Sequence, residues 1–483
     1  MFRKFHLTFS VFTAIVVLAL ASYFFSRHVA AVAQNGAKPE ATATPPSPSA
    51  AITQALPPGT ITFIPKAPTL VVTVARKYLT ESSYMTVAEL ETAIRNANGG
   101  KTSFKKEEQV LVPGIEPQPV VEKSRPFPKD EEIRAVYLTG STAGSAHGIE
   151  LIRHWKEAGG NAVVFDIKDS DGTVNVPFQH PLAPIQKNHP LSNLPKFIRY
   201  VHSLDMHAIA RIALFRDNNI AQHHSTLAVQ SRRTHQPWRE NGKLVWTDPS
   251  RPEVQDYDLA LAKYAASSGA DEIQFDYVRF PAEGDQKDAL FAFQSDPKLH
   301  RDDVIAGFLA RAYDQLHPMG VLLSLDVFGI MAWQRSVDLN HTGQDIVKMA
   351  KHCDVISPMI YPSHFFGMDG YKVPGDAPEH FISISMDRFK KITADSGVVL
   401  RPWLQAFRWR TPTYSPQYIL KQVSTSKEHG GTGFLFWNAG NDYSKPFAAM
   451  PTMLAHPDAY LKVTQTAATT AKIPENKPEQ ANK

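Results

Sequence analysis

The sequence predicts an α/β protein whose main domain is a (β/α)₈ barrel (TIM barrel), preceded by an N-terminal hydrophobic helix, a disordered linker and a small α+β module. The chain of 483 residues is long enough for one large domain with additions. Between residues 133 and 460, eight short apolar runs alternate with amphipathic stretches, which is typical of βα units. No GxGxxG phosphate loop follows the first run, and this favours a barrel over a doubly wound sheet.

The first 33 residues predict an export signal. Arg3 and Lys4 precede an apolar stretch from about Leu7 to Phe25. This length is closer to a membrane span of ~20 residues than to a signal-peptide core of ~7–15 residues. Because Ala31-Val32-Ala33 offers a cleavage site, both an uncleaved signal-anchor and a cleaved signal peptide stay open. Either one places the remainder outside the cytoplasm, anchored to the membrane through the N-terminal helix or secreted.

Segments rich in Pro and Ala separate the predicted domains. Residues 34–68 contain KPEATATPPSPSA and are expected to form a disordered linker, because this composition buries too little apolar surface to fold. Residues 116–132 are expected to be a second, Pro-rich linker, and residues 461–483 a disordered tail. A small module over residues 69–115 and a barrel over residues 133–460 lie between these segments.

The small module is expected to run strand, helix, helix, strand. It opens with the apolar run Leu70-Val71-Val72 and closes with the strand-like QVLVP. Two helix-like pieces, VARKYLT and TVAELETAIRNANGG, lie between them, and Thr86 precedes Glu89 at the spacing of a capping box. This order, with the closing KKEEQVLVPG, resembles a LysM module. The resemblance implies a ligand that contains N-acetylglucosamine, such as peptidoglycan, and a purely structural module is the alternative.

The eight barrel strands are expected at short apolar runs that polar or Gly-rich segments separate. The runs are apolar enough for strands that are buried on both faces. They are Ile133–Leu138, Ala162–Ile167, Ala208–Leu214, Glu272–Val278, Val321–Phe328, Val355–Tyr361, Leu400–Phe407 and Gly433–Trp437. Helices are expected over Ile149–Ala158, which Gly159-Gly160 would end, and over Pro252–Ser267, Asp303–Leu316, Gly343–His352, Met386–Ser396 and Pro416–His429.

Composition argues against several classes of function. The net charge is only +4, whereas a nucleic-acid-binding protein carries a concentrated basic face, so we expect no nucleic-acid partner. The single cysteine, Cys353, permits neither an intramolecular disulfide nor a multi-cysteine metal site, and it is expected to be a buried structural thiol. Neither an HxH nor an HExxH motif occurs. We therefore expect no metal and no cofactor.

Two aspartates are the candidate catalytic residues. Barrel enzymes place their chemistry at the C-terminal ends of the strands. Asp276 interrupts the apolar fourth strand, where it shares a face with Gln274, and Asp326 is its counterpart on the fifth. Two carboxyls at one height on adjacent strands would lie roughly 5–8 Å apart, which covers both retaining and inverting glycosidases. One would stay protonated as the acid, and the other ionised as nucleophile or base.

Further polar and aromatic residues at strand ends are candidates for substrate binding. Sugar rings present C–H faces that stack on aromatic side chains, and charged or amide groups bind hydroxyls. Several candidates have structural alternatives: Arg279 could pair with Asp276, and Arg211 could form a salt bridge in the core. Trp403 and Phe407, inside the seventh strand, are expected in the core. The candidates are Asp166, Lys168, Arg211, Arg279, Tyr361, His364, Gln405, Trp409, Trp437 and Asn438.

Four motifs, in order along the chain, carry a family resemblance. ADEIQFDYVRFP, SLDVFG, SPMIYPSHF and RPWLQAFRW resemble a bacterial family of domains of unknown function that is grouped with the glycoside hydrolases, over about Ile133 to Tyr460. That family is similar to the α-amylase-type barrels, which implies a nucleophile-like Asp at Asp276 and an acid at Asp326. The amylase pattern has Arg where this chain has Gln274, and its acid is usually Glu.

The sequence therefore predicts a glycosidase that hydrolyses O-glycosyl bonds in an extracytoplasmic polysaccharide or a peptidoglycan-like cell-wall glycan. Two alternatives stay open. One is a non-catalytic, wall-associated glycan-binding protein on the same scaffold, and the other is a metal-dependent hydrolase. The sugar, the linkage and the stereochemical outcome do not follow from the sequence.

Overall fold

The computed structural model describes residues 56–462. The predicted signal or anchor segment (1–33), most of the predicted linker and nearly all of the predicted tail lie outside these residues. Among the helices of residues 56–462, none is both long enough and apolar enough to cross a membrane.

The small module packs two helices, α1 (Val71–Tyr78) and α2 (Val87–Ala97), against two short antiparallel sheets. The capping box predicted at Thr86 and Glu89 is confirmed. Val71 and Val72 begin α1, so the strand predicted there is wrong beyond Leu70. The sheets pair β1 (Ile61–Phe63) with β4 (Val110–Val112), and β2 (Thr69–Leu70) with β3 (Ser103–Phe104). Because β1 lies inside the predicted linker, the module begins before Thr69.

Part of the second predicted linker has an ordered contact surface, because residues 120–127 pack onto the N-terminal end of the barrel. Val120 is buried. The backbone N–H of Arg125 donates to Asp271 at 2.7 Å, and the Phe127 ring lies 4.2 Å from the His207 ring. The segment therefore covers the end of the barrel opposite the expected site.

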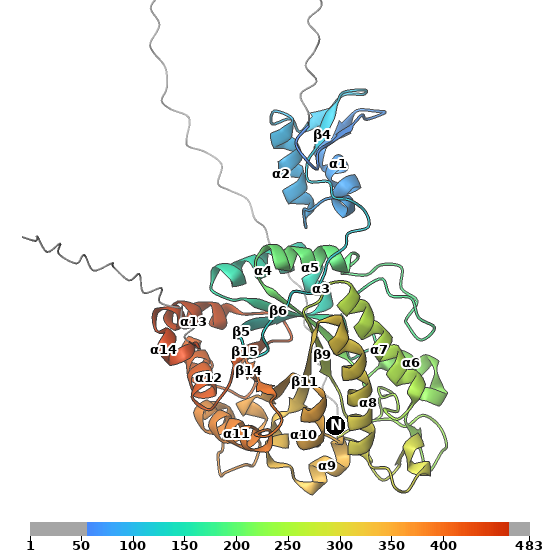
Figure 1. The fold of residues 1–483 in the computed structure, drawn as a ribbon, viewed down its shortest axis with the longest axis vertical. Coiled ribbons are helices and arrows are strands. Elements are labelled where there is room, and N and C mark those ends of the chain that lie inside the picture. The colour runs from blue at the N-terminus through green and yellow to red at the C-terminus, as the bar shows by residue number, and fades with distance from the viewer. Residues whose placement is uncertain (1–55, 463–483) are drawn as a thin grey trace, which may run out of the picture. The chain divides into compact units, whose positions relative to one another are not determined.

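The predicted barrel is confirmed: eight strand positions pair in parallel in chain order, and the last strand pairs with the first. Figure 1 shows these strands at the centre of the domain. They are β5 (Ile133–Leu138), β6 (Ala162–Lys168), β7 (His207–Ala213), β9 (Glu272–Asp276), β11 (Leu322–Phe328), β12 (Val355–Ile360), the split pair β13 (Val399–Leu400) and β14 (Trp403–Gln405), and β15 (Gly433–Trp437).

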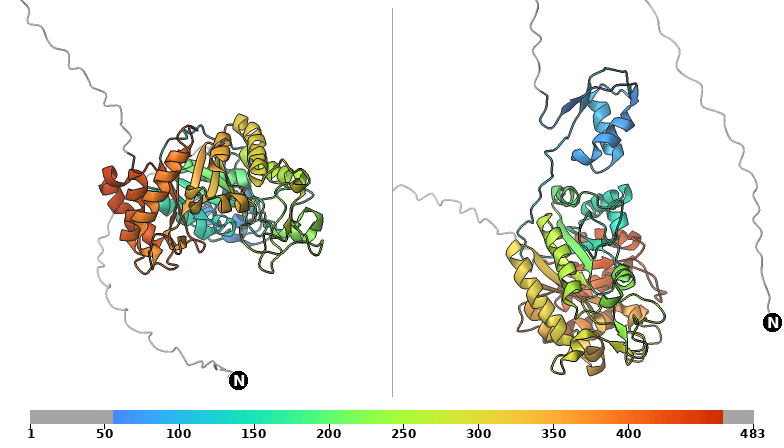
Figure 2. Two further views of the ribbon diagram at one scale, coloured as in Figure 1. Left: turned by 90° about the horizontal axis from the view of Figure 1, so that it is seen from below. Right: turned by 90° about the vertical axis from the view of Figure 1, so that its right-hand side faces the viewer.

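Helices surround the strands, with α7 and α8 along one side of the barrel and α11 to α13 along the other (Figures 1 and 2). Gly159, at φ +97°, follows α4 as the predicted C-cap. The main helices are α4 (Ala146–Glu157), α5 (Leu194–Ser203), α7 (Pro252–Ser267), α8 (Arg301–Leu316), α11 (Pro378–Ile392), α12 (Pro416–Glu428) and α13 (Ser444–Ala455). Shorter ones are α3 (Gly140–Ala143), α6 (Asn218–His223), α9 (Ser336–Thr342), α10 (Ile346–Met349) and α14 (Pro457–Tyr460).

The helix predicted over Met386–Ser396 in fact runs from Pro378 to Ile392, and α5 and α13 were not predicted. Three further elements differ from their predicted bounds for local reasons. The seventh strand is interrupted between β13 and β14, where Pro402 has no N–H to donate to a neighbouring strand. The fourth strand ends at Asp276 rather than Val278, because Tyr277 takes a positive φ. The helix predicted over Gly343–His352 is wrong in its first part, since Gly343 instead follows the end of α9 in a left-handed conformation.

Candidate active site

Four charged side chains from consecutive barrel strands meet at the C-terminal end of the barrel. Arg211 of β7 donates to Asp166 of β6 and, at 2.5 Å, to Asp276 at the end of β9. The Nε of Arg211 lies 3.7 Å from Oδ2 of Asp326 on β11. One guanidinium is thus shared by three carboxyls, and the cluster carries an excess of negative charge if all three ionise.

Strand register brings the two candidate catalytic residues to one level. β9 and β11 pair in parallel with Ser324 beside Gln274. Two residues further along each strand, Asp276 and Asp326 therefore lie on neighbouring strands and point to the same face. Both face Arg211, which shows that this face is the barrel interior.

Asp276 is the carboxyl of this cluster that is most open to solvent, with 12% of its side chain exposed. Its Oδ1 accepts the backbone N–H of Tyr277 at 2.5 Å, and its Oδ2 accepts from Arg211. Asp276 thus accepts one hydrogen bond from a backbone amide and one from a guanidinium. Tyr277 has φ +51°, a costly conformation for a bulky residue that is concentrated at functional sites.

Asp326 is almost completely buried, with 1% of its surface exposed. Burial raises its pKa well above the ordinary value, and the neighbouring Asp276 charge raises it further, although Arg211 opposes the shift. Its Oδ1 accepts the indole N–H of Trp403 at 2.7 Å. The cluster therefore combines one carboxyl surrounded by donors with one that favours the protonated form, as acid–base chemistry requires.

Asp166 contacts Arg211 inside the barrel and has no surface open to a substrate. It is fully buried, and its Oδ2 accepts the Tyr137 hydroxyl at 2.5 Å while Oδ1 faces Arg211. Burial raises its pKa to about 6, against the opposing effect of Arg211. The expectation that Asp166 binds a sugar hydroxyl is thus corrected: it is a positioning residue.

Lys168 is also not a substrate ligand. Its side chain is fully buried outside the barrel interior, where it pairs with Asp258 of α7 at 2.7 Å and with Asp217 at 2.9 Å. Its ammonium donates in addition to the carbonyl of Leu214 at 3.0 Å. The ion pair with Asp169 considered from the sequence does not form, because Lys168 ties β6 to α7 instead.

The side chains of two residues predicted to bind substrate through their amides form hydrogen bonds to neighbouring loops. Gln405 is fully buried, with its Oε1 accepting from the Ser363 backbone and its Nε2 donating to Phe407 and Thr411. Asn438 donates to two carbonyls and accepts the Gly440 N–H at 2.8 Å. Gln405 is closed off from solvent, so the substrate-binding role predicted for it is corrected. Asn438 is only half-buried, and the role predicted for it stays a prediction.

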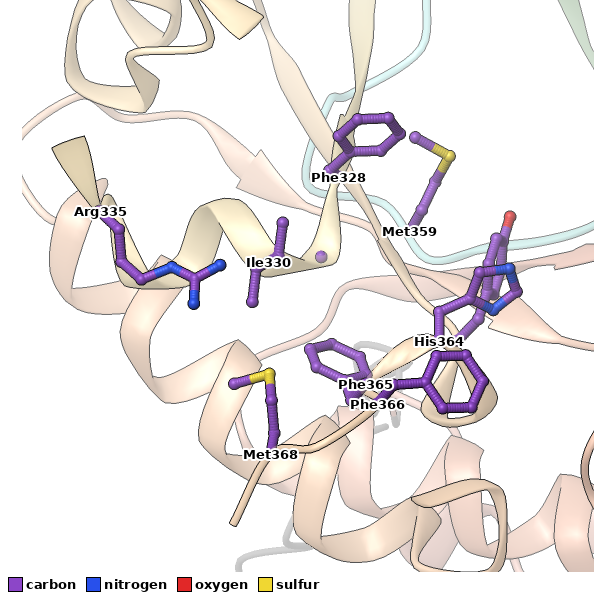
Figure 3. Close-up of a pocket in the computed structure, with 10 residues that line it drawn as sticks. Phe328, Ile330, Arg335, Met359, His364, Phe365, Phe366 and Met368 are labelled. Carbon is purple, nitrogen blue, oxygen red and sulfur yellow. The ribbon is translucent and has the colours of Figure 1, made fainter. Parts of the chain in front are cut away.

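A cavity of about 420 Å³ opens beside the ends of β11 and β12 (Figure 3). Apolar side chains dominate its lining, and Figure 3 shows Ile330, Phe365 and Met368 converging on it. Tyr361 and His364, two predicted binding residues, lie on its wall. Burial raises the pKa of Tyr361 well above the ordinary value, and the charges of the two candidate catalytic carboxyls add to the shift. Tyr361 therefore connects this cavity to the carboxyl cluster.

A second cavity of about 420 Å³ lies on the other side of Phe328, which lines both. Its lining includes Tyr277, Arg279 and Arg216. Arg279 is the predicted binding residue that reaches this space. The alternative considered from the sequence, an ion pair between Arg279 and Asp276, does not form, because Arg211 takes that place.

The two predicted tryptophan platforms differ in exposure. Trp437 is half-buried above the barrel interior, with its ring 5.9 Å from that of Tyr361. Trp409 is 48% exposed, and its ring lies 4.9 Å from that of His364. Trp409 is therefore the more exposed of the two, although the Arg410 guanidinium lies 4.5 Å from its ring centre, whereas Trp437 packs against the side chains of the barrel interior.

The sequence analysis missed two partners of the cluster. Tyr137 was not singled out, although it donates to Asp166, and Trp403 was expected to be an ordinary core residue, although it donates to Asp326. A partial signal was present, because buried Tyr and Trp side chains usually need an acceptor. Which carboxyl serves as that acceptor depends on contacts between strands that the sequence does not specify.

The family assignment rests on a domain model. Residues 135–443 match the family described as "Putative glycosyl hydrolase domain". The chain belongs to this family. The match runs from within β5 to the residue before α13 and includes each carboxyl of the cluster. The family resemblance recognised from the sequence motifs is therefore confirmed.

Solved structures similar to the chain include a hypothetical protein from Ruminiclostridium thermocellum, at 34% identity over 40% of this chain and 97% of that one, with a TM-score of 0.35. The PgaB (BpsB) glycoside hydrolase domain from Bordetella bronchiseptica is 15% identical over 68% and 97% of the two chains, with a TM-score of 0.47. The spore cortex-lytic enzyme SleL from Bacillus megaterium is 14% identical over 83% and 87%, with a TM-score of 0.41. Comparison with curated proteins finds no match.

Proposed function

We propose that the barrel hydrolyses O-glycosyl bonds of an extracytoplasmic polysaccharide or cell-wall glycan, with Asp276 as the ionised nucleophile or base and Asp326 as the general acid. The observation that carries this proposal is the difference between two neighbouring carboxyls at one guanidinium. Asp276 is partly exposed and held by two donors, and Asp326 is buried with a raised pKa. Membership of a glycosyl hydrolase family supports the same chemistry.

In the proposed reaction, the protonated Asp326 transfers its proton to the leaving glycosidic oxygen as the bond to the anomeric carbon breaks. Asp276 either attacks that carbon directly or takes a proton from the attacking water. In the first case water then hydrolyses the glycosyl ester on Asp276 and gives its proton to the ionised Asp326, which restores both carboxyls. Arg211 limits the repulsion between the two carboxylates once both are ionised. Tyr361 and His364 line the space where sugar rings would stack, and the Trp409 ring lies 4.9 Å from that of His364.

One observation favours a second candidate, a non-catalytic glycan-binding protein. Asp326 has only 1% of its surface exposed, and its oxygens face Trp403 and Arg211. A carboxyl held in this way donates a proton to a substrate only if the substrate displaces one of these contacts. In the alternative, Asp326 is a structural partner of Arg211, and the barrel binds glycans without turnover.

Release of reducing ends from a panel of polysaccharides distinguishes the two candidates. Wild-type protein is compared with Asp276→Asn, Asp326→Asn and the control Asp256→Asn, whose carboxylate forms an exposed ion pair with Arg311 on the outer helices. We expect both site variants to lose about 10²- to 10⁴-fold in rate while keeping wild-type circular dichroism, because each removes an acid–base or nucleophilic group. The control variant keeps the wild-type rate.

Full activity in Asp276→Asn would overturn the catalytic proposal. Glycan binding in the wild type and in Asp276→Asn, without reducing-end release from either, would establish the binding protein instead.

We propose further that the chain is exported, as a membrane-anchored or secreted protein, and that the LysM-like module adds contacts to a wall glycan. Fractionation of cells that express the full chain tests the first point, and recovery of the protein in the cytosol would overturn it. Glycan pull-down with and without residues 56–115 tests the second.

A further inference from the structure

Arg279 is a buried cation without an anionic partner. Only 8% of its surface is exposed, and within residues 56–462 it forms no ion pair. Its one hydrogen bond there runs from Nη1 to the Phe280 carbonyl, at 3.0 Å. The two other buried arginines of the barrel, Arg211 and Arg401, each contact carboxylates. Because a buried charge without a counter-charge is costly, Arg279 calls for an explanation.

Aromatic rings hold the Arg279 guanidinium in place. Its central carbon lies 4.3 Å from the ring centre of Phe328, 4.8 Å from that of Trp246 and 5.3 Å from that of Tyr277. Such cation–π contacts use the faces of a guanidinium and leave its in-plane N–H groups available as donors. Nε and Nη2 of Arg279 have no acceptor among residues 56–462. The side chain is pre-positioned, with donors that are not used.

A second cation lies in the same cavity. Arg216 is half-buried, donates through Nη1 to the carbonyl and hydroxyl of Ser170, and forms no ion pair in the part of the chain that the structure describes. Lys243 adds a third positive charge at the exposed rim. The rim also contains Glu240 and Glu283, but neither reaches the guanidinium of Arg279 or Arg216 as an ion pair. The floor of the cavity is therefore cationic.

The cavity is lined by residues that follow the proposed nucleophile closely in the chain. Tyr277, which lines it, directly follows Asp276 and donates its backbone N–H to that carboxylate. Arg279 follows two residues later. A glycan whose scissile bond lies at Asp276 would place a neighbouring sugar unit in this space.

We propose that this cavity is an anion subsite, in which Arg279 and Arg216 bind an oxyanion substituent of the sugar next to the cleaved bond. The substrate is then an acidic glycan that bears carboxylates or sulfate esters. This inference rests on the proposed glycoside hydrolase function for its position relative to the scissile bond. Guanidinium groups bind carboxylate and sulfate oxygens in a bidentate way, which a neutral sugar hydroxyl does not match.

Binding measurements in the Asp276→Asn background test the subsite independently of turnover. The probes are oligouronates with their carboxyl-reduced counterparts, and sulfated oligosaccharides with their desulfated counterparts, titrated by calorimetry. We expect one charged member to bind more tightly than its neutral counterpart, and the arm that shows this preference identifies the anion. Arg279→Gln should lower the affinity for that member about 10- to 100-fold, as expected for a lost charge-assisted hydrogen bond, and remove the preference.

Two matched variants control for charge and for folding. Arg311→Gln removes a positive charge from an exposed ion pair on α8 and should keep the preference. Arg279→Lys keeps the charge but loses the bidentate geometry, and should bind with intermediate affinity. Thermal unfolding adds a separate readout: a ligand-binding role predicts that Arg279→Gln melts at or above the wild-type temperature, because an uncompensated buried charge is removed.

An unchanged preference in Arg279→Gln, or no preference for any charged probe, would overturn the anion subsite even if the protein hydrolyses neutral glycans. A preference that depends on Arg279, in a protein without turnover on any glycan, would support the subsite and overturn the hydrolase proposal instead.

Discussion

Two ionic clusters inside the same barrel have opposite charge balances. At the C-terminal end, one guanidinium, that of Arg211, faces three carboxyls. At the N-terminal end, one carboxylate, that of Glu272, accepts from Arg401 at 2.8 Å and lies 3.2 Å from Nε2 of His207. Both clusters lie inside one barrel, and they differ in the ratio of acids to bases.

The pKa values follow this ratio. In the cluster at the N-terminal end (the lower cluster), burial alone would raise the pKa of Glu272, but Arg401 and His207 more than offset it and lower the pKa to about 2. In the cluster at the C-terminal end (the upper cluster), burial raises the pKa of Asp166 to about 6 even though Arg211 opposes it. The lower cluster is therefore a closed ion pair that holds strands together, and the upper cluster retains a site for a proton.

Access to solvent differs in the same direction. The lower cluster is fully buried, and Phe127 packs against His207 at that end of the barrel. At the upper cluster, Asp276 remains partly exposed, and two cavities that share Phe328 in their linings open at the same end of the barrel. Of the two clusters, only the upper one combines a carboxyl of raised pKa with a carboxyl that is partly open to solvent, as expected of a functional site.

Removal of the cation from the lower cluster should reduce stability more than any other change considered below. Arg401→Met leaves Glu272 buried with only His207 as a partner, and we expect the free energy of unfolding at pH 7 to fall by about 3–5 kcal/mol. Urea denaturation monitored by fluorescence measures this change. Arg311→Met, which breaks an exposed ion pair, should cost at most about 1 kcal/mol. A loss below about 1 kcal/mol in Arg401→Met would show that the lower cluster is not structural.

The pH dependence of stability should have opposite signs at the two clusters. The pKa of Glu272 falls from 4.5 to about 2 on folding, so its stabilisation is present above pH 4.5 and is lost as the pH falls toward 2. The pKa of Asp166 rises from 3.8 to about 6, so its contribution is present below pH 3.8 and is lost as the pH rises through 6. Each amounts to about 3 kcal/mol.

Unfolding free energies of Glu272→Gln and Asp166→Asn, measured against the wild type between pH 3 and 8, test these signs. The stability advantage of the wild type over Glu272→Gln should shrink as the solution is acidified below pH 4.5. The advantage over Asp166→Asn should shrink as the pH is raised from about 4 to 6. The comparison of the two clusters fails if both differences change in the same direction.

Removal of the indole donor next to Asp326 should have a smaller effect, which tests the acid role proposed for Asp326. Trp403→Phe removes the indole hydrogen bond that lowers the pKa of Asp326, so the basic limb of the pH–rate profile should move to higher pH. The stability loss should be about 1 kcal/mol, as for one hydrogen bond. Trp155→Phe is the matched control, because it removes an indole hydrogen bond to the Arg134 carbonyl outside the barrel interior. A basic limb that stays in place in Trp403→Phe would separate Asp326 from the acid role.

Much of the fold could be predicted because it depends on local patterns. Six-residue apolar runs such as Ile133–Leu138 become strands wherever both faces are covered, and the helix Pro252–Ser267 was predicted to the residue. The errors occur where one residue overrides the pattern, as Pro402 does in the seventh strand and Tyr277 in the fourth. The packing of residues 120–127 onto the barrel could not be predicted, because a proline-rich composition does not specify what the segment contacts.

Local patterns along the chain were enough to predict the barrel, its strand order and the acids at the ends of strands four and five. The alternation of side chains along a strand follows from backbone geometry and needs no partner. Only the tertiary structure decided which charges share a neighbour: Lys168 with Asp217 and Asp258, and Arg211 with the site carboxyls. Ion pairing depends on distances between strands and helices far apart in the chain, and the energy of each charge depends on burial that no local pattern encodes.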